Sequence, residues 1–314
     1  MVKSIQRVAI IGTGTIGASW AALFLARGLD VTATDIAPGA EARLRQYIDQ
    51  AWPALERIGL AEGADRQRLR FTANLAEAVA SADLVQENGP ERIDFKTALY
   101  EQLDRLLPAE VLIASSSSGL TMSAIQAGCK LHPERCVIGH PFNPPHLIPL
   151  VEIVGGARTS EATITRVTAF YDGLGKRTVR LRKEMPGHVA NRLAAALFRE
   201  IVYLVSEGVL DVADADTAVC WGPGLRWGVM GPSLLYHLGG GAGGIEHFFD
   251  QFTGPLTAMW RSLGDPVITP EVRRLMIAGV HKETDGRSLE ALAAQRDEAL
   301  LSLLAARAGE SARP

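Results

Sequence analysis

A glycine-rich turn near the N-terminus limits the possible folds more than any other feature of the sequence. The segment Gly12-Thr13-Gly14-Thr15-Ile16-Gly17 follows the apolar run Val8–Ile11 and precedes a helical stretch over Ala18–Ala26. In a strand-to-helix turn of this form, the first glycine permits the tight turn, the second lets the backbone approach a pyrophosphate, and the third allows close packing of helix on strand. Free N–H groups at the helix start would bind the phosphates. The turn therefore predicts a dinucleotide site formed by Gly12, Gly14, Thr15, Ile16 and Gly17.

A carboxylate at the end of the second predicted strand indicates which dinucleotide binds. Asp35 closes Val31–Thr34, where a carboxylate would accept hydrogen bonds from the adenosine ribose hydroxyls. The same charge would repel a 2′-phosphate, and the following Ile36-Ala37-Pro38 supplies no arginine to neutralise one. NAD is therefore the predicted cofactor. The alternative role for Asp35 is that of a helix cap or turn residue.

Short β-branched runs alternate with helical stretches from Arg7 to about Leu181, which is typical of a parallel sheet covered by helices. After Met185-Pro186-Gly187 the pattern changes to helical spacing, beginning with His188–Gly208. We therefore predict an α/β fold, with an N-terminal Rossmann-type doubly wound parallel sheet over residues 1–186 and an all-α domain over residues 187–314. The expected strands are Val8–Ile11, Val31–Thr34, Leu84–Gln86, Val111–Ala114, Val137–Gly139, Leu150–Val154 and Thr178–Leu181.

Length and composition agree with this two-domain reading. The chain has 314 residues, of which 47% are hydrophobic, and a net charge of −3, as in ordinary soluble globular proteins. Without a basic excess, neither nucleic acid nor a membrane is an expected partner. The polar N-terminus favours a cytoplasmic location. Three cysteines without CxxC spacing favour reduced thiols over disulfides or a metal site.

A histidine and a glutamate stand out at the end of the predicted sheet. His140 ends the strand Val137–Gly139, and Glu152 lies twelve residues later inside the apolar strand Leu150–Val154. A lone histidine is normally a satisfied polar group, but a carboxylate in a strand this apolar needs a partner. Pairing the two side chains would supply one.

Two further polar clusters follow other predicted strands. Glu91 and Lys96 come after Leu84–Gln86, at a sheet edge that would face the cofactor. Their spacing alone favours an exposed pair at a helix start. The serines Ser115–Ser118 follow the next strand, and serine clusters usually form loops or helix caps. Spacing alone therefore assigns no function to either cluster.

Several of these motifs occur together and in a fixed order. They are Gln86–Glu91 (QENGPE), His140–Pro144 (HPFNP), Lys183–Gly187 (KEMPG) and Trp221–Trp227 (WGPGLRW). With them the chain resembles the 3-hydroxyacyl-CoA dehydrogenase superfamily along nearly its whole length. Within that superfamily it looks most like the branch that contains L-carnitine dehydrogenase and lambda-crystallin, which is similar to L-gulonate 3-dehydrogenase.

The resemblance implies a role for each polar residue. His140 would be the catalytic base and Glu152 its orienting partner, while Ser118 and Asn191 would contact the substrate. Because Asn191 lies early in the first long helix of the second domain, the active site would lie in the cleft between the domains; by pattern alone it is an ordinary surface asparagine. The implied catalytic residues are His140, Glu152, Ser118 and Asn191, and the implied cofactor contacts beyond the glycine turn are Asp35, Glu91, Lys96, Ser118 and Asn143.

The implied activity is NAD-dependent oxidation of the 3-hydroxyl of a small free L-3-hydroxy acid to the 3-oxo acid. Neutral His140 would accept the hydroxyl proton while hydride passes to NAD, and Glu152 would stabilise the imidazolium. The acyl-CoA enzymes carry a lysine-rich helical excursion suited to the coenzyme A phosphates. Residues 36–70 of this chain contain no lysine, and six arginines nearly balance five acids. This departure favours a free acid, with an (S)-3-hydroxyacyl-CoA dehydrogenase as the alternative.

Two residues of the last motif are candidate substrate contacts. Arg226 would form a bidentate pair with a substrate carboxylate, or alternatively bridge helices as a structural arginine. Trp227 and the aromatic residues around it would line a trimethylammonium pocket, or alternatively form a core or a dimer interface. L-carnitine is therefore the favoured substrate, followed by an L-gulonate-like sugar acid.

A function of another class is also open. Crystallin relatives suggest a catalytically silent NAD-binding structural protein, although the intact His140, Glu152 and Asn191 weigh against it. The resemblance also implies a homodimer formed through the helical domain. The run Gly239–Gly244 is either a mobile substrate loop or a flexible turn, and the sequence does not decide between them.

Overall fold

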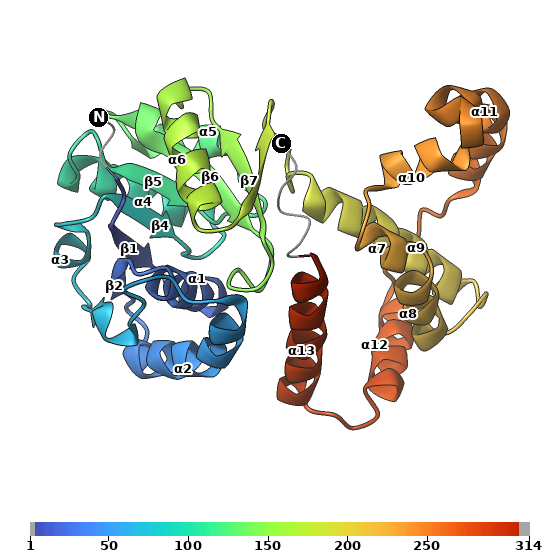
Figure 1. Ribbon diagram of the computed structural model, residues 1–314, viewed down its shortest axis with the longest axis horizontal. Helices are drawn as coiled ribbons and strands as arrows, with labels where there is room; N and C mark the ends of the chain where they lie inside the picture. Colours follow the sequence, from blue (N-terminus) through green and yellow to red (C-terminus); the bar gives the residue numbers. More distant parts are fainter. Residues whose placement is uncertain (1–3, 308–314) are drawn as a thin grey trace. The chain divides into compact units, whose positions relative to one another are not determined.

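The computed structural model describes residues 4–307 (Figure 1). The chain divides into two compact units. The first runs to Asn191 and also takes in Ala299–Ala305, and the second holds Arg192–Glu298 together with Ala306 and Arg307.

The first unit is built around one eight-stranded sheet. Its strands are β1 (Arg7–Ile11), β2 (Asp30–Thr34), β3 (Leu69–Phe71), β4 (Leu84–Glu87), β5 (Leu112–Ser115), β6 (Cys136–Pro141), β7 (Leu150–Gly155) and β8 (Arg177–Leu181). They lie in the order β3-β2-β1-β4-β5-β6-β7-β8. The strand order reverses between β1 and β4, which is the arrangement of a doubly wound dinucleotide-binding sheet. The predicted fold class is confirmed.

The sheet departs from the sequence prediction in two places. The short strand β3 was not expected. It has three residues and pairs only with β2. The expectation of a parallel sheet is wrong for one pairing, since β6 and β7 run antiparallel. Only eight residues join these strands, and a parallel crossover needs a dozen or more. The reversal places His140 directly opposite Glu152 in the strand register.

Helices cover both faces of the sheet. They are α1 (Thr15–Ala26), α2 (Ala40–Ile58), α3 (Leu75–Val79), α4 (Ile93–Leu106), α5 (Met122–Ile125) and α6 (Glu161–Gly173), with the 3-10 turns η1 (Arg66–Arg68), η2 (Gln126–Gly128) and η3 (Pro133–Arg135). One apolar cluster joins α1, α2 and α6 to the sheet, and a second joins α3, α4 and α5. The two clusters explain why the strands read as continuous apolar runs.

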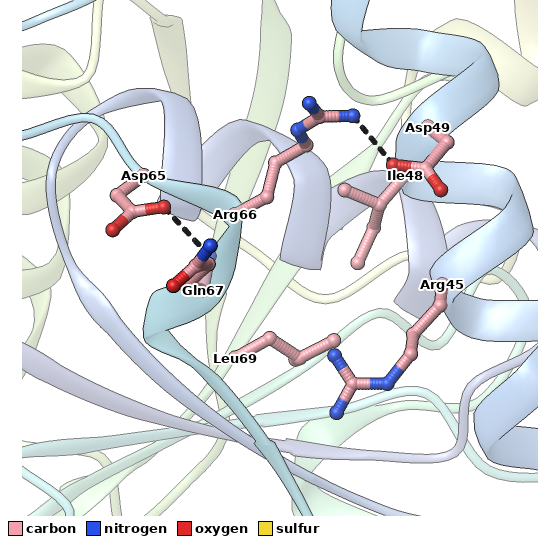
Figure 2. A pocket seen from close by; sticks show the side chains of 7 residues that line it. All are labelled: Arg45, Ile48, Asp49, Asp65, Arg66, Gln67 and Leu69. Atoms are coloured by element: carbon pink, nitrogen blue, oxygen red, sulfur yellow. Dashed lines mark hydrogen bonds and ion pairs between the residues drawn. The ribbon is translucent and has the colours of Figure 1, made fainter.

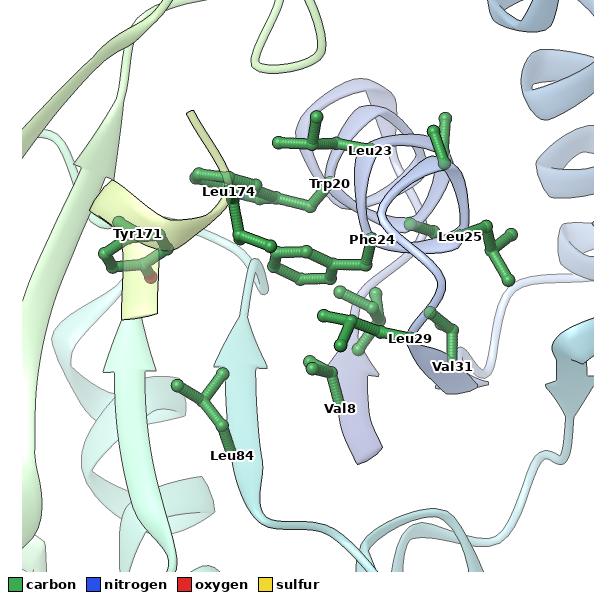
Figure 3. Packing of buried hydrophobic residues seen from close by; sticks show 14 of the residues in the cluster. Val8, Trp20, Leu23, Phe24, Leu25, Leu29, Val31, Leu84, Tyr171 and Leu174 are labelled. Atoms are coloured by element: carbon green, nitrogen blue, oxygen red, sulfur yellow. The ribbon is translucent and has the colours of Figure 1, made fainter. Parts of the chain in front are cut away.

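Helix α1 is the centre of the first cluster (Figure 3). Ten of its twelve residues are buried, so it is apolar on all sides rather than along one stripe. Trp20 and Phe24 stack with 5.3 Å between ring centroids, and Tyr171 of α6 lies 5.4 Å from Trp20. This packing holds the start of α1, and hence the glycine turn, against the end of β1.

The chain after β8 is helical, as predicted. The helices after β8 are α7 (Ala190–Ser206), α8 (Val212–Trp221), α9 (Pro223–Trp227), α10 (Pro232–Gly239), α11 (Gly244–Ser262), α12 (Pro270–Thr284) and α13 (Leu289–Arg307), with the 3-10 turn η4 (Gly241–Gly243). The glycine run Gly239–Gly244 therefore ends α10 and begins α11. Among residues 4–307, no helix is long and apolar enough to cross a membrane.

The glycine turn has little room for side chains. Gly12 has a left-handed φ of +82°, and a Cβ there would lie 2.7 Å from the carbonyl oxygen of Asn88. A Cβ on Gly17 would lie 1.9 Å from the carbonyl oxygen of Gly12, whereas a Cβ on Gly14 would meet nothing within 4 Å. The first and third glycines are therefore required by the backbone itself, and Gly14 leaves open space above the helix start.

We predict that Gly17→Ala destabilises the ligand-free protein, because its methyl group collides with backbone that cannot move without opening the turn. The expected loss is about 1–3 kcal/mol, or several degrees in the thermal midpoint. Gly14→Ala is the matched control and should keep the midpoint within about 1 °C. Thermal unfolding without NAD measures both, and equal midpoints for the two variants would contradict the steric argument.

Candidate active site

His140 and Glu152 form a buried pair across the antiparallel strands β6 and β7. His140 Nδ1 lies 2.8 Å from Glu152 Oε2, and the two residues are 5% and 1% exposed. An ionised carboxylate can only accept hydrogen bonds, so the proton between the two atoms belongs to Nδ1. In the neutral imidazole, Nε2 then has a free lone pair. The pair is therefore arranged to take up a proton at Nε2.

The second oxygen of Glu152 binds the start of α7. Glu152 Oε1 accepts the backbone N–H groups of Val189 at 2.8 Å and Ala190 at 3.0 Å. Burial raises the pKa of Glu152, but the hydrogen bonds from His140 and from these two amides outweigh it, and the pKa lies below its ordinary 4.5. Glu152 therefore stays ionised, and one carboxylate fixes both the histidine and the first turn of the helix. Asn191, which is half-buried, is the next residue of α7.

Asp35 binds the glycine turn through Thr13. Asp35 Oδ2 accepts hydrogen bonds from the N–H of Thr13 at 2.7 Å and from its hydroxyl at 3.0 Å, and Oδ1 accepts the N–H of Ala37 at 2.9 Å. Burial opposes ionisation, but these bonds outweigh it and lower the pKa of Asp35. A second lone pair of Oδ1 is left for a ligand hydroxyl. The start of α1 has no side-chain cap, so its first amides are available to an anion.

Lys96 lies in a buried ion pair that the sequence analysis did not identify. Its ammonium donates to Glu87 Oε1 at 2.7 Å and Oε2 at 2.8 Å, and both side chains are fully buried. Ser115 donates its hydroxyl to Glu87 at 2.6 Å, and the N–H of Gly89 does so at the same distance. Glu91, the predicted companion of Lys96, lies farther away, at 3.9 Å. A direct cofactor contact by Lys96 stays a prediction.

Glu91 organises the serine loop instead. Its Oε1 accepts the hydroxyl of Ser117 at 2.6 Å, the N–H of Gly119 at 2.7 Å and the N–H of Leu120 at 3.1 Å. Although burial opposes it, these bonds lower the pKa of Glu91. The half-buried Ser118 lies between the tethered residues. The serines are therefore a shaped loop at the carboxyl end of β5, where ligands bind in doubly wound sheets.

Comparison with known proteins identifies the family. Residues 7–185 match the 3-hydroxyacyl-CoA dehydrogenase NAD binding domain, and residues 187–272 match the 3-hydroxyacyl-CoA dehydrogenase C-terminal domain. Together these matches span most of the chain. The chain belongs to the 3-hydroxyacyl-CoA dehydrogenase family. As a member of this family it is an NAD-dependent oxidoreductase, which confirms the predicted enzyme class and cofactor.

Two similar sequences are both named L-carnitine dehydrogenase. The protein from Streptomyces griseus is 48% identical over 97% of this chain and 90% of its own length. The protein from Pseudomonas putida is 45% identical over 97% of this chain and 95% of its own length. These similarities agree with the branch resemblance drawn from the motifs.

Two solved structures are also similar to this chain. One is 5-formyl-3-hydroxy-2-methylpyridine 4-carboxylic acid 5-dehydrogenase, described as an NAD⁺-dependent dismutase, with 33% identity, a TM-score of 0.83, and coverage of 99% of this chain and 100% of that one. The other is 3-hydroxybutyryl-CoA dehydrogenase from Escherichia coli, with 30% identity, a TM-score of 0.65, and coverage of 88% of this chain and 57% of that one.

The site fits the NAD that the family uses. Gly12 and Gly17 leave no room for side chains, the space above Gly14 is open, and the amides at the start of α1 lack a cap. Asp35 keeps a lone pair at the end of β2, where the adenosine ribose would lie. The residues that would hold NAD are therefore those of the glycine turn and Asp35, with Glu91, Lys96, Ser118 and Asn143 as further predicted contacts.

In this chain, the arginines between β2 and β3 largely bind neighbouring groups of the same chain. A cavity of about 430 Å³ opens between α2 and η1, and Figure 2 shows its side chains. On its wall Arg66 pairs with Asp49 at 2.6 Å. Arg45 pairs with Glu41 at 2.8 Å, and Arg68 with Asp30 at 2.9 Å. The positive charges that a coenzyme A phosphate would need are therefore offset in this region.

The sequence analysis missed three contributors to the site, and they differ in how clearly the sequence marks them. Glu87 could have been found, because it ends an apolar strand and needs a buried partner as Glu152 does. Ser117 contributes its backbone carbonyl as well as its hydroxyl, and a carbonyl leaves no mark in a sequence. His188 was expected inside a helix, but it precedes α7 with a left-handed φ of 51°. The two predicted substrate contacts, Arg226 and Trp227, lie on α9 and are exposed.

The ionised Glu152 gives a pH-dependent prediction. Its pKa is lower in the folded protein than in the unfolded chain, so its stabilising effect is present at neutral pH and is lost as the pH falls through the folded value. We predict that Glu152→Gln is less stable than wild type at pH 7 by about 1.5–3 kcal/mol, the range for hydrogen bonds to a charged group. The difference should shrink as the pH falls below 4.5.

Thermal midpoints across this pH range measure the effect. Glu41→Gln removes one partner of an exposed ion pair on α2 and serves as the control, with an expected change below about 1 °C at every pH. A constant gap between wild type and Glu152→Gln from pH 7 to pH 3 would show that the carboxylate charge does not stabilise the fold.

Proposed function

We propose that this enzyme oxidises the 3-hydroxyl of a small free L-3-hydroxy acid, with L-carnitine as the favoured substrate and an L-gulonate-like sugar acid as the second candidate. The observation that carries the reaction is the buried His140–Glu152 pair with its free Nε2 lone pair. The relatives named L-carnitine dehydrogenase, at 45–48% identity, support the substrate class.

In the mechanism, the substrate proton passes to His140. His140 Nε2 accepts the hydroxyl proton of the substrate, because Nδ1 already holds a proton donated toward Glu152. Glu152 then lies 2.8 Å from the ring that becomes positively charged and stabilises it. NAD, when bound, supplies the hydride acceptor. Ser118 and Asn191 hold the substrate oxygen in this proposal, since each is half-buried and lies next to residues tied to Glu91 or Glu152.

Two observations favour a free acid over the (S)-3-hydroxyacyl-CoA alternative. Residues 36–70 contain no lysine, and Arg45, Arg66 and Arg68 are paired with carboxylates. A coenzyme A phosphate would have to break such pairs before it could bind. A small acid needs only one cationic group, and we assign that role to Arg226, with Trp227 as the aromatic face for a trimethylammonium group.

The exposed apolar side chains of the second unit support a homodimer. Trp221 is 78% exposed, Trp260 64% and Leu238 61%, and these residues come from α8, α11 and α10. Large aromatic residues in such positions are typical of surfaces that a second subunit covers. We therefore propose that two copies of this chain associate through the helical unit. A cytoplasmic location stays a prediction.

The silent structural alternative is disfavoured by the intact site. A protein kept only for its fold has no need for a buried histidine tied to an ionised carboxylate, because burying a charge is costly. NAD binding without turnover on any hydroxy acid would revive this alternative.

A substrate comparison tests the proposal. We expect NADH formation with L-carnitine, weaker activity with L-gulonate and 3-hydroxybutyrate, and at least about 100-fold lower kcat/KM with 3-hydroxybutyryl-CoA, equivalent to about 2.7 kcal/mol of transition-state binding. Absorbance at alkaline pH measures all four, with D-carnitine as the stereochemical control. Activity confined to the thioester would overturn the substrate assignment.

A second prediction tests the base. His140→Gln should lower turnover by about 10²–10⁴-fold, the usual scale of acid–base catalysis, while the Kd for NADH stays within about twofold. His132→Gln is the control, because this histidine lies at the surface of the same unit, 3.3 Å from Glu134. Near-normal turnover of His140→Gln would remove His140 from the mechanism.

A further inference from the structure

A second histidine, His188, packs against the catalytic base. Its ring centroid lies 4.9 Å from that of His140, with 50° between the ring planes. His188 is 2% exposed and immediately precedes the two residues whose amides bind Glu152.

The backbone at His188 is held in an unfavourable conformation. Its φ of 51° is left-handed, which costs a non-glycine residue about 1–2 kcal/mol. The N–H of His188 donates to the carbonyl of Met185 at 2.9 Å, and this turn directs the next two amides toward Glu152. Strain of this kind persists where surrounding contacts fix it, and it is common at functional sites.

The hydrogen bonds of the His188 ring define its proton. Nε2 lies 2.9 Å from the backbone carbonyl oxygen of Ser117. A carbonyl only accepts, so Nε2 carries the hydrogen. Nδ1 is buried and has no hydrogen-bond partner among residues 4–307, so a proton there would have no acceptor. The ring is therefore a neutral imidazole with one defined tautomer.

The surroundings of the His188 ring shift its pKa in opposite directions. Burial lowers the pKa of His188, the hydrogen bond to Ser117 raises it, and nearby His140 lowers it further, while Glu152 and Glu91 raise it. The net effect is a pKa below the ordinary 6.5, which favours the neutral ring. A neutral aromatic ring packed on an imidazolium is favourable, whereas a second positive charge would oppose the first.

We propose that His188 is a positioning residue for this reaction, which holds the ring of His140 in place and ties it to the serine loop. Through Ser117 it is joined to Ser118, the predicted substrate contact, and through the following amides it is joined to Glu152. It thereby keeps the base, its carboxylate and the serine loop in fixed positions relative to one another. The inference rests on the proposed function only in that His140 is the base.

Two variants distinguish the contribution of the aromatic ring of His188 from that of its hydrogen-bond donor. His188→Phe keeps an aromatic ring and loses the hydrogen bond to Ser117. His188→Asn loses the ring, while asparagine tolerates left-handed backbone better than most residues. His132→Phe is the matched control, because His132 lies at the surface of the same unit and its side chain is 40% exposed.

The rate of NADH formation in a single turnover is the main measurement. We expect both variants to lower this rate by about 10–100-fold, the scale of a small misplacement of a reacting group. The KM for the hydroxy acid and the Kd for NADH should change by less than about threefold, because the defect lies in the chemical step. The control should match wild type. Rates within twofold of wild type for both variants, or a loss confined to KM, would overturn the proposal.

A second measurement does not depend on turnover. In ¹⁵N-histidine-labelled wild type at pH 6.5, where an ordinary histidine is half charged, His188 should give the signals of a neutral ring with hydrogen on Nε2. A charged ring, or hydrogen on Nδ1, would refute the proposal even if no substrate were found. Absence of turnover with the neutral Nε2–H form present would instead count against the proposed function alone.

Discussion

The site depends on one buried carboxylate. Glu152 lies in the middle of an apolar strand at 1% exposure, and such a charge is tolerated only when its oxygens are hydrogen-bonded. One oxygen accepts from His140, and the other accepts from the amides of Val189 and Ala190. The same bonds that make the charge stable therefore orient His140 and fix the first turn of α7. The orientation of His140 and the folding of the first turn of α7 therefore both follow from the need to hydrogen-bond one buried carboxylate.

Most of the fold could be predicted from the sequence, because apolar runs and glycine spacing report local structure directly. Seven of the strands were expected within one or two residues, and the turn Gly12–Gly17 has the backbone that its glycines require. The sequence did not reveal strand β3, since three residues with Arg70 in the middle make too short a pattern. It also did not reveal that β7 runs antiparallel to β6. The eight-residue connection before it was the available signal, because no parallel crossover is that short.

The site was predictable where a residue was chemically out of place. Glu152 in an apolar strand, His140 at a strand end and Asp35 after β2 could each be recognised in this way, and the structure brings the first two together. Lys96 shows the limit of spacing, because its ammonium lies nearest to Glu87 on β4, at 2.7 Å, while Glu91 is 3.9 Å away. His188 shows another limit, since a left-handed residue before a helix leaves no periodic pattern. Contacts made by backbone groups, such as the carbonyl of Ser117, depend on tertiary structure alone.

We propose that Glu152 sets the tautomer of His140, so that Nε2 is free to take the substrate proton. The ¹⁵N resonances of His140 in histidine-labelled wild-type protein, at a pH where the ring is neutral, test this most directly. We expect hydrogen on Nδ1 and a bare Nε2. A neutral ring with hydrogen on Nε2 could not accept the hydroxyl proton at that atom, and its observation would contradict this role of Glu152.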